Sequence, residues 1–250
     1  MTDYTKQIQW ARLIAEGAAI IVSILIAFAI DAWWADRQEQ IKSRQLTERL
    51  LSDLQKDLES RTELVRYYEA VIDSANRTVS RMNDMSIDDP VAFVIDAYRA
   101  TEYLYRSQTR TSFDEIVSSG SMGLIPESAR QAGFADYYRY DPSLAMLDAV
   151  RASPYRNRVR RLIPHDVQTA IRTNCRLADE IQGETLGIKK SCELGLPEKR
   201  MEETAAILLS DKELLPDLRL HFSVLLALTP YFRTDVQRLD ASIQALRAAD

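Results

Sequence analysis

The sequence predicts an all-α protein in which an N-terminal transmembrane helix continues into a long helix and is followed by an antiparallel helical bundle. The 250 residues include only seven glycines and eight prolines, too few to favour a turn-rich β architecture. Residues 17–30 are uncharged, and two later stretches repeat apolar residues in steps of three and four, as packed helices do. We expect a short tail and membrane anchor over residues 1–34, a long coiled-coil-like helix over 35–89, and the remaining helices of the bundle over 90–250.

The apolar segment needs its flanks to cross a membrane. As a helix, residues 17–30 cover about 21 Å of a hydrocarbon core that is about 30 Å thick. Trp10 on one side and Trp33 and Trp34 on the other stand about 35 Å apart along a helix, which matches two interfacial aromatic belts. The pattern predicts a span over residues 10–34, with the lipid bilayer as its partner.

A cleaved signal peptide is the main alternative to this signal-anchor. Lys6 and Arg12 form a positive n-region, and Ala27 and Ala29 form an A-x-A site whose cleavage would leave Ile30 as the first residue. The tryptophan pair and a charged helical stretch follow without a break, as in an uncleaved anchor. The anchor is favoured, and a secreted helical protein stays open as the alternative.

Two features lie inside the expected span. Glu16 costs a few kcal/mol unless it is paired, protonated or able to reach the interface. Its place four residues from Arg12 favours a side chain that snorkels to water. Ala19, Ser23 and Ala27 recur at every fourth position, a small-residue pattern that lets two helices approach closely. This face is the candidate contact for a homo-oligomer or for another membrane protein.

The span also resembles a family signature. Glu16, six further residues, a small residue and then Ile24, Leu25, Ile26, Ala27, Ile30 and Trp33 resemble a family of uncharacterised single-span bacterial membrane proteins, known as a domain of unknown function. Ser23 stands where the family has glycine, and Asp31 and Ala32 stand where it has two asparagines. A looser likeness follows over residues 112–138, and together the two stretches cover about a fifth of the chain. The resemblance implies a membrane location and an all-helical exterior domain, and it implies no activity.

Two apolar seams organise the rest of the chain. The first comprises Leu51, Leu54, Leu58, Arg61, Val65, Tyr68, Ile72, Ala75, Val79 and Met82, and only Arg61 breaks its apolar character. The second comprises Leu218, Phe222, Leu225, Thr229, Phe232, Val236, Leu239, Ile243 and Leu246. We expect these two helices to pair antiparallel. The apolar run at 222–229 is too short for a second span and is expected in the core.

Proline and glycine positions divide the middle of the chain. We expect a helix over residues 90–106, a loop over 118–123, and a helix that restarts at Pro126 and ends near Tyr140. A third long helix is expected to begin near Ser143 and to be interrupted at Pro154 and Pro164.

No pattern in the sequence indicates catalysis. His165 and His221 lack a second ligand at helical spacing, so surface positions on helices are expected, with no metal and no cofactor. No nucleophile elbow or phosphate-binding glycine loop occurs, and we expect a protein that is not an enzyme. The net charge of −5 argues against nucleic-acid binding.

Two further groups of residues are candidates for a structural or binding role. Cys175 and Cys192 would form a disulfide in an oxidising compartment and two ordinary thiols in the cytosol. The concentrated basic residues suit an anion or an acidic partner, although a solvated helix face is the commoner explanation for such a run. This basic stretch comprises Arg151, Arg156, Arg158, Arg160 and Arg161.

The sequence therefore suggests a membrane-anchored structural or protein-interaction module of the bacterial envelope. The alternative is a ligand-binding sensor that works with a separate signalling subunit. Two basic residues precede the span and four follow it closely, which by count alone places the bundle in the cytoplasm. The short N-terminal stub with its amine and the cysteine pair favour the opposite orientation, and we expect a periplasmic bundle.

Overall fold

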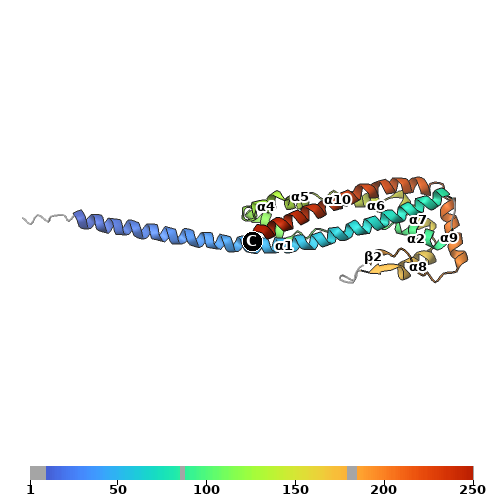
Figure 1. Cartoon of the computed structure of the whole chain (residues 1–250), viewed down its shortest axis with the longest axis horizontal. Coiled ribbons are helices and arrows are strands. Elements are labelled where there is room, and N and C mark those ends of the chain that lie inside the picture. Colours follow the sequence, from blue (N-terminus) through green and yellow to red (C-terminus); the bar gives the residue numbers. More distant parts are fainter. Residues whose placement is uncertain (1–9, 85–87, 179–184, 250) are drawn as a thin grey trace, which may run out of the picture.

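The computed structural model describes residues 10–84, 88–178 and 185–249. Its longest element is α1, Trp10–Asp84, a single helix of 75 residues. The expected anchor and the expected long helix are therefore one unbroken helix that runs to Asp84. The sequence of α1 contains no proline and only one glycine, Gly17, so no residue in it forces a break. Its first part extends alone from the rest of the molecule (Figure 1).

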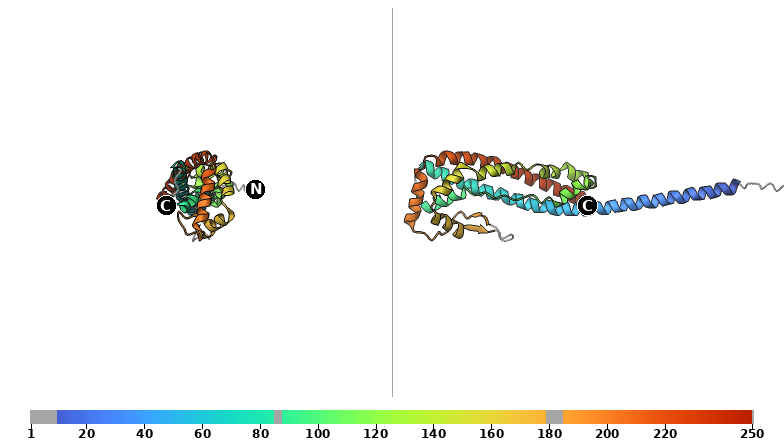
Figure 2. Two further views of the ribbon diagram at one scale, coloured as in Figure 1. Left: turned by 90° about the vertical axis from the view of Figure 1, so that its right-hand side faces the viewer. Right: turned by 180° about the vertical axis from the view of Figure 1, so that it is seen from behind.

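The second long element, α10 (Leu214–Ala249), packs antiparallel along the later part of α1. Two views show α10 returning along α1 until the C-terminus meets the point where α1 leaves the bundle (Figures 1 and 2). The all-α class and the antiparallel pairing are confirmed.

Short helices fill the sides and far end of this pair. They are α2 (Pro90–Arg99), α3 (Thr111–Ser118), η1 (Ser121–Leu124), α4 (Glu127–Gln131), α5 (Phe134–Arg139), α6 (Ser143–Arg151), α7 (Pro154–Leu162), α8 (His165–Asn174) and α9 (Glu198–Ser210). The end-on view shows α9 crossing the far end of the bundle (Figure 2).

Local sequence explains where these helices begin and end. The predicted breaks at Pro154 and Pro164 are present, and the Ser153 hydroxyl accepts from the Arg156 backbone N–H at 3.3 Å as the cap of α7. The expected helix over 90–106 is shorter, because α2 ends at Arg99. The expected helix after Pro126 is split into α4 and α5 at Gly133, which has a left-handed φ of 97°.

A small hairpin was not expected. Strand β1 (Arg176–Ala178) pairs antiparallel with β2 (Thr185–Ile188), and Arg176 lies opposite Ile188. Among the described residues these are the only strands. They follow α8, in a part of the chain for which no helix or strand was expected.

The core runs along the whole length of the α1–α10 pair. Its near end, beside the bare part of α1, joins Leu50 and Leu54 to Leu239 and Ile243. The middle joins residues such as Tyr68 to Leu225 and Phe232. The far end is built by α2, α7, α8 and α9 with the last turns of α1 and the first turns of α10. The burial of Leu225, Leu228 and Thr229 agrees with the core position expected for residues 222–229.

The buried stripe of α1 differs in register from the predicted seam. Leu54, Arg61, Tyr68, Ala75 and Met82 are buried as expected. The intervening predicted members are only half-buried, and the neighbour one position earlier is buried in each case. The half-buried residues are Leu51, Leu58, Val65, Ile72 and Val79, and the buried ones are Leu50, Asp57, Leu64, Val71 and Thr78. The half-buried members still pack against the core, and the buried Asp57 and Thr78 are polar, so an apolar pattern does not detect them.

Candidate functional site

The bare part of α1 is the clearest candidate for a functional surface. No residue from 14 to 42 is buried, and the large apolar side chains from Ile14 to Trp34 are between 49% and 68% exposed. They cover every side of the helix and not one stripe, whereas the surface helix of a soluble domain exposes a polar face. Among the described residues this is the one helix long and apolar enough to cross a membrane.

The predicted anchors and contact residues lie along this segment. Trp33 and Trp34 are both exposed, with ring centroids 6.3 Å apart. The side chain of Trp10 lies outside the described part of the structure. Glu16 is exposed. The expected helix-pairing face of Ala19, Ser23 and Ala27 is also exposed, and the Ser23 hydroxyl donates to the Ala19 carbonyl at 2.8 Å. Helix pairing through this face stays a prediction.

The five arginines of residues 151–161, considered above as a possible patch, do not form one surface. Arg151 and Arg161 are exposed. Arg158 donates to Asp217 at 2.7 Å and lies 3.4 Å from Asp211. Arg156 and Arg160 turn instead toward the segment after α2. A helix distributes neighbouring side chains around its axis, and α7 has protein on more than one side, so a run in sequence is divided in space.

Glu102 pairs with two arginines near the far end, Arg160 from this stretch and Arg172 from α8. Its carboxylate, 6% exposed, pairs with Arg160 and with Arg172, the latter at 2.8 Å. Arg160 also lies over the ring of Tyr98, 3.6 Å from its centroid, and Arg172 donates to the Tyr98 hydroxyl at 2.8 Å. The expected helix over 90–106 gave no indication of this position, because Glu102 follows the end of α2.

Arg61, the one charge in the predicted seam, is the centre of a buried polar cluster. It is 1% exposed, donates to the Tyr137 hydroxyl at 3.1 Å and pairs with Asp141 at 3.2 Å. Asp235 lies 3.6 Å away, and burial raises the pKa of this carboxyl to about 6 despite the nearby guanidinium. Nη1 of Arg61 is buried with no hydrogen-bond partner among the described residues.

The two histidines differ from each other. His165 is exposed as expected, but the surface position expected for His221 is wrong, since His221 is 2% exposed. Its Nε2 lies 2.9 Å from the Ala100 carbonyl, which can only accept, so Nε2 carries the proton. Burial lowers its pKa to about 4. In the described part of the chain no three histidine, cysteine, aspartate or glutamate side chains group as a metal site.

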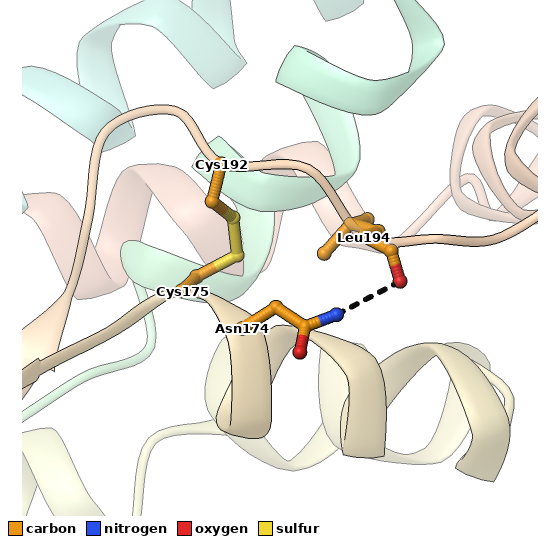
Figure 3. Close-up of a disulfide and its surroundings, with 4 residues drawn as sticks. All are labelled: Asn174, Cys175, Cys192 and Leu194. Atoms are coloured by element: carbon orange, nitrogen blue, oxygen red, sulfur yellow. Dashed lines mark hydrogen bonds between the residues drawn. A yellow bond between two sulfur atoms is a disulfide. The ribbon is translucent and has the colours of Figure 1, made fainter.

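Cys175 and Cys192 form a disulfide, with their Cα atoms 5.3 Å apart (Figure 3). Cys175 ends α8, and the bond ties this end to the loop that follows the hairpin. Beside it the Asn174 side chain donates to the Leu194 carbonyl at 3.0 Å. Closing a loop of this size contributes about 3 kcal/mol in the chain-entropy model. The disulfide therefore fixes the base of the hairpin on the bundle.

Comparison with known proteins adds no assignment. No family model matches the chain, and no curated protein or solved structure matches it significantly.

Proposed function

We propose that this chain is a single-span membrane protein whose helical bundle acts, without catalysis, as a structural or protein-interaction module of the bacterial envelope. The observation that carries the proposal is α1. One helix contains an apolar segment exposed on all sides and then, without a break, supplies the buried stripe of the bundle. A helix with no partner in water exposes this surface at a large cost, which a lipid bilayer removes.

The continuous helix α1 suits a rigid connection between the span and the bundle. The bare helix from Trp34 to Leu46, where burial begins, spans about 18 Å as a helix, so the bundle stands close to the membrane surface. Because no loop separates span from bundle, a change in tilt or pairing of the span would be carried into the bundle. The disulfide supports an extracytoplasmic bundle, since such bonds persist in oxidising compartments.

Alkaline carbonate extraction tests the anchor. The full chain is expected to stay in the membrane pellet. A variant with Ile21→Arg and Leu25→Arg is expected to lose this retention, because each arginine near the centre of a span costs about 3 kcal/mol on insertion scales. The matched control is Gln38→Arg with Gln45→Arg, two exposed positions later on α1, and it should behave as the parent.

Quantitative release of the parent chain would contradict the anchor. So would a mature N-terminus at Ile30, which would identify a cleaved, secreted helical protein. Cross-linking through a cysteine at Ala19 or Ala27 would separately show whether the small-residue face pairs two copies.

A further inference from the structure

A cleft lies beside α1 near the far end of the bundle. It consists of two hollows, of about 240 Å³ and about 410 Å³, which share Tyr67 and Glu102 in their linings and so adjoin each other. Val71 and Ile188 give the smaller hollow an apolar wall, and Tyr67 separates it from the larger one. This combination of an apolar wall and a few charged groups is typical of a small-molecule site.

The cleft has an excess of positive charge. Its linings contain four arginines and two glutamates, although the whole chain carries a net charge of −5. The excess lies in the larger hollow, because the smaller one is lined by two arginines and two glutamates. Glu102 is already shared by Arg160 and Arg172, so one carboxylate serves two guanidinium groups. Arg156 lies 4.8 Å from the centroid of the Tyr103 ring and donates to the Thr101 carbonyl, and no carboxylate pairs with it among the described residues.

Arg99 provides the main evidence that the cleft binds an anion. It lines the smaller hollow and is half-buried, yet its guanidinium group makes no hydrogen bond or ion pair with any described residue. Burial, and then repulsion from Arg77, lower the pKa of Arg99. A half-buried cation without a partner costs free energy, which a bound anion would offset.

The hairpin is fitted closely to this cleft. Gly187 has a φ of +139°, and a Cβ at this position would lie 2.9 Å from Cε2 of Tyr67. Any larger residue would push the strand away from the Tyr67 ring and open the wall. The Cys175–Cys192 disulfide and the hydrogen bond from Lys189 N–H to the Cys175 carbonyl, at 2.7 Å, hold the hairpin in place.

We propose that this cleft binds a small organic anion, whose charged group pairs with Arg99 and whose apolar body lies against Tyr67, Val71 and Ile188. The anion comes from solution and not from the membrane that holds the span. Tyr67 follows Trp34 by 33 residues of one continuous helix. That separation is about 50 Å, far beyond the headgroup region.

Calorimetric titration of the full chain in zwitterionic nanodiscs tests the proposal with three probes: 1-naphthyl phosphate, inorganic phosphate and 1-naphthol. Empty nanodiscs supply the background. We expect 1-naphthyl phosphate to bind with a Kd below about 1 mM. The other two probes should bind at least ~10-fold more weakly, because inorganic phosphate lacks the apolar ring and 1-naphthol lacks the charged group.

Arg99→Gln is expected to weaken binding of 1-naphthyl phosphate by at least ~10-fold, as loss of a charge-assisted contact does. Arg161→Gln is the matched control, since Arg161 is exposed on α7, outside both hollows, and its variant should bind as the parent does. Without probe, Arg99→Gln should be at least as stable as the parent, whereas a purely structural arginine would leave a less stable protein. Ala70→Leu, which fills the smaller hollow without changing charge, should also abolish binding.

Four results would overturn the proposal. These are absence of binding to the parent, equal binding by Arg99→Gln and Arg161→Gln, inorganic phosphate that binds as tightly as the naphthyl ester, and loss of stability in Arg99→Gln without probe.

Discussion

Leu225→Asp is expected to unfold the bundle or to lower its free energy of unfolding by more than about 4 kcal/mol. Leu225 is fully buried in the middle of the α1–α10 interface, against residues such as Leu64 and Tyr68. The substitution removes the apolar contacts and places a carboxylate inside an apolar cluster. Because whole domains are stable by only about 5–15 kcal/mol, one such change is enough to abolish folding.

The neighbouring residue supplies the control. Leu226 is 49% exposed on the other side of α10, so Leu226→Asp should change stability by no more than about 0.5 kcal/mol. Thermal unfolding of both variants, followed by far-ultraviolet circular dichroism, checks the pair. Leu54→Asp should match Leu225→Asp, whereas Leu58, which is half-buried, should tolerate the change better. Equal stability of Leu225→Asp and Leu226→Asp would refute the described packing.

Arg61→Met is expected to destabilise the bundle by roughly 3 kcal/mol at neutral pH. Arg61 is the cation between Asp141 and Asp235, whose side chains are both 17% exposed. Without it the two carboxylates lose their partner in a site that water barely reaches. The triple variant Arg61→Met, Asp141→Asn, Asp235→Asn should recover most of the loss, because no unpaired charge remains.

The pH dependence of Arg61→Met has a definite sign. The pKa of Asp235 is already raised to about 6 in the folded protein, and removal of Arg61 raises it further. A carboxyl whose pKa is raised on folding contributes stability below its unfolded pKa, near 4, and loses it as pH rises through the folded value. Urea unfolding should therefore show a smaller deficit for Arg61→Met at pH 5 than at pH 7.5.

The exposed Arg44 on α1 provides the control, and Arg44→Met should show no such trend. A deficit in Arg61→Met that is independent of pH, or no recovery in the triple variant, would mean that Arg61 acts through packing alone.

The long-range pairing was predictable because it depends on periodicity, which survives without knowledge of partners. The buried stripe of α1 was predicted in alternate positions only. Asp57 can be buried because its carboxylate accepts a hydrogen bond from the Thr109 N–H at 2.8 Å. A local sequence pattern cannot predict a partner that lies 52 residues away. An apolar template therefore chose Leu58 instead.

The same limit applies to the polar clusters. Arg61 was visible as an exception in the seam, but Asp141 and Asp235 come from distant segments that only the fold brings together. The position of Glu102 was not predictable, because α2 ends at Arg99, earlier than its sequence indicates. Conversely, the arginines of residues 151–161 are neighbours in sequence and were considered as one possible patch, but Arg156, Arg158 and Arg160 on α7 contact different partners.

We propose that one span holds this bundle outside the cytoplasm, and reporter fusions after Asp250 test this orientation. Alkaline phosphatase needs oxidative folding and should be active in this position, whereas green fluorescent protein fused to the same residue and exported by the same route should be dark. An inactive but stably expressed phosphatase fusion, together with a fluorescent counterpart, would place the bundle in the cytoplasm and contradict the account.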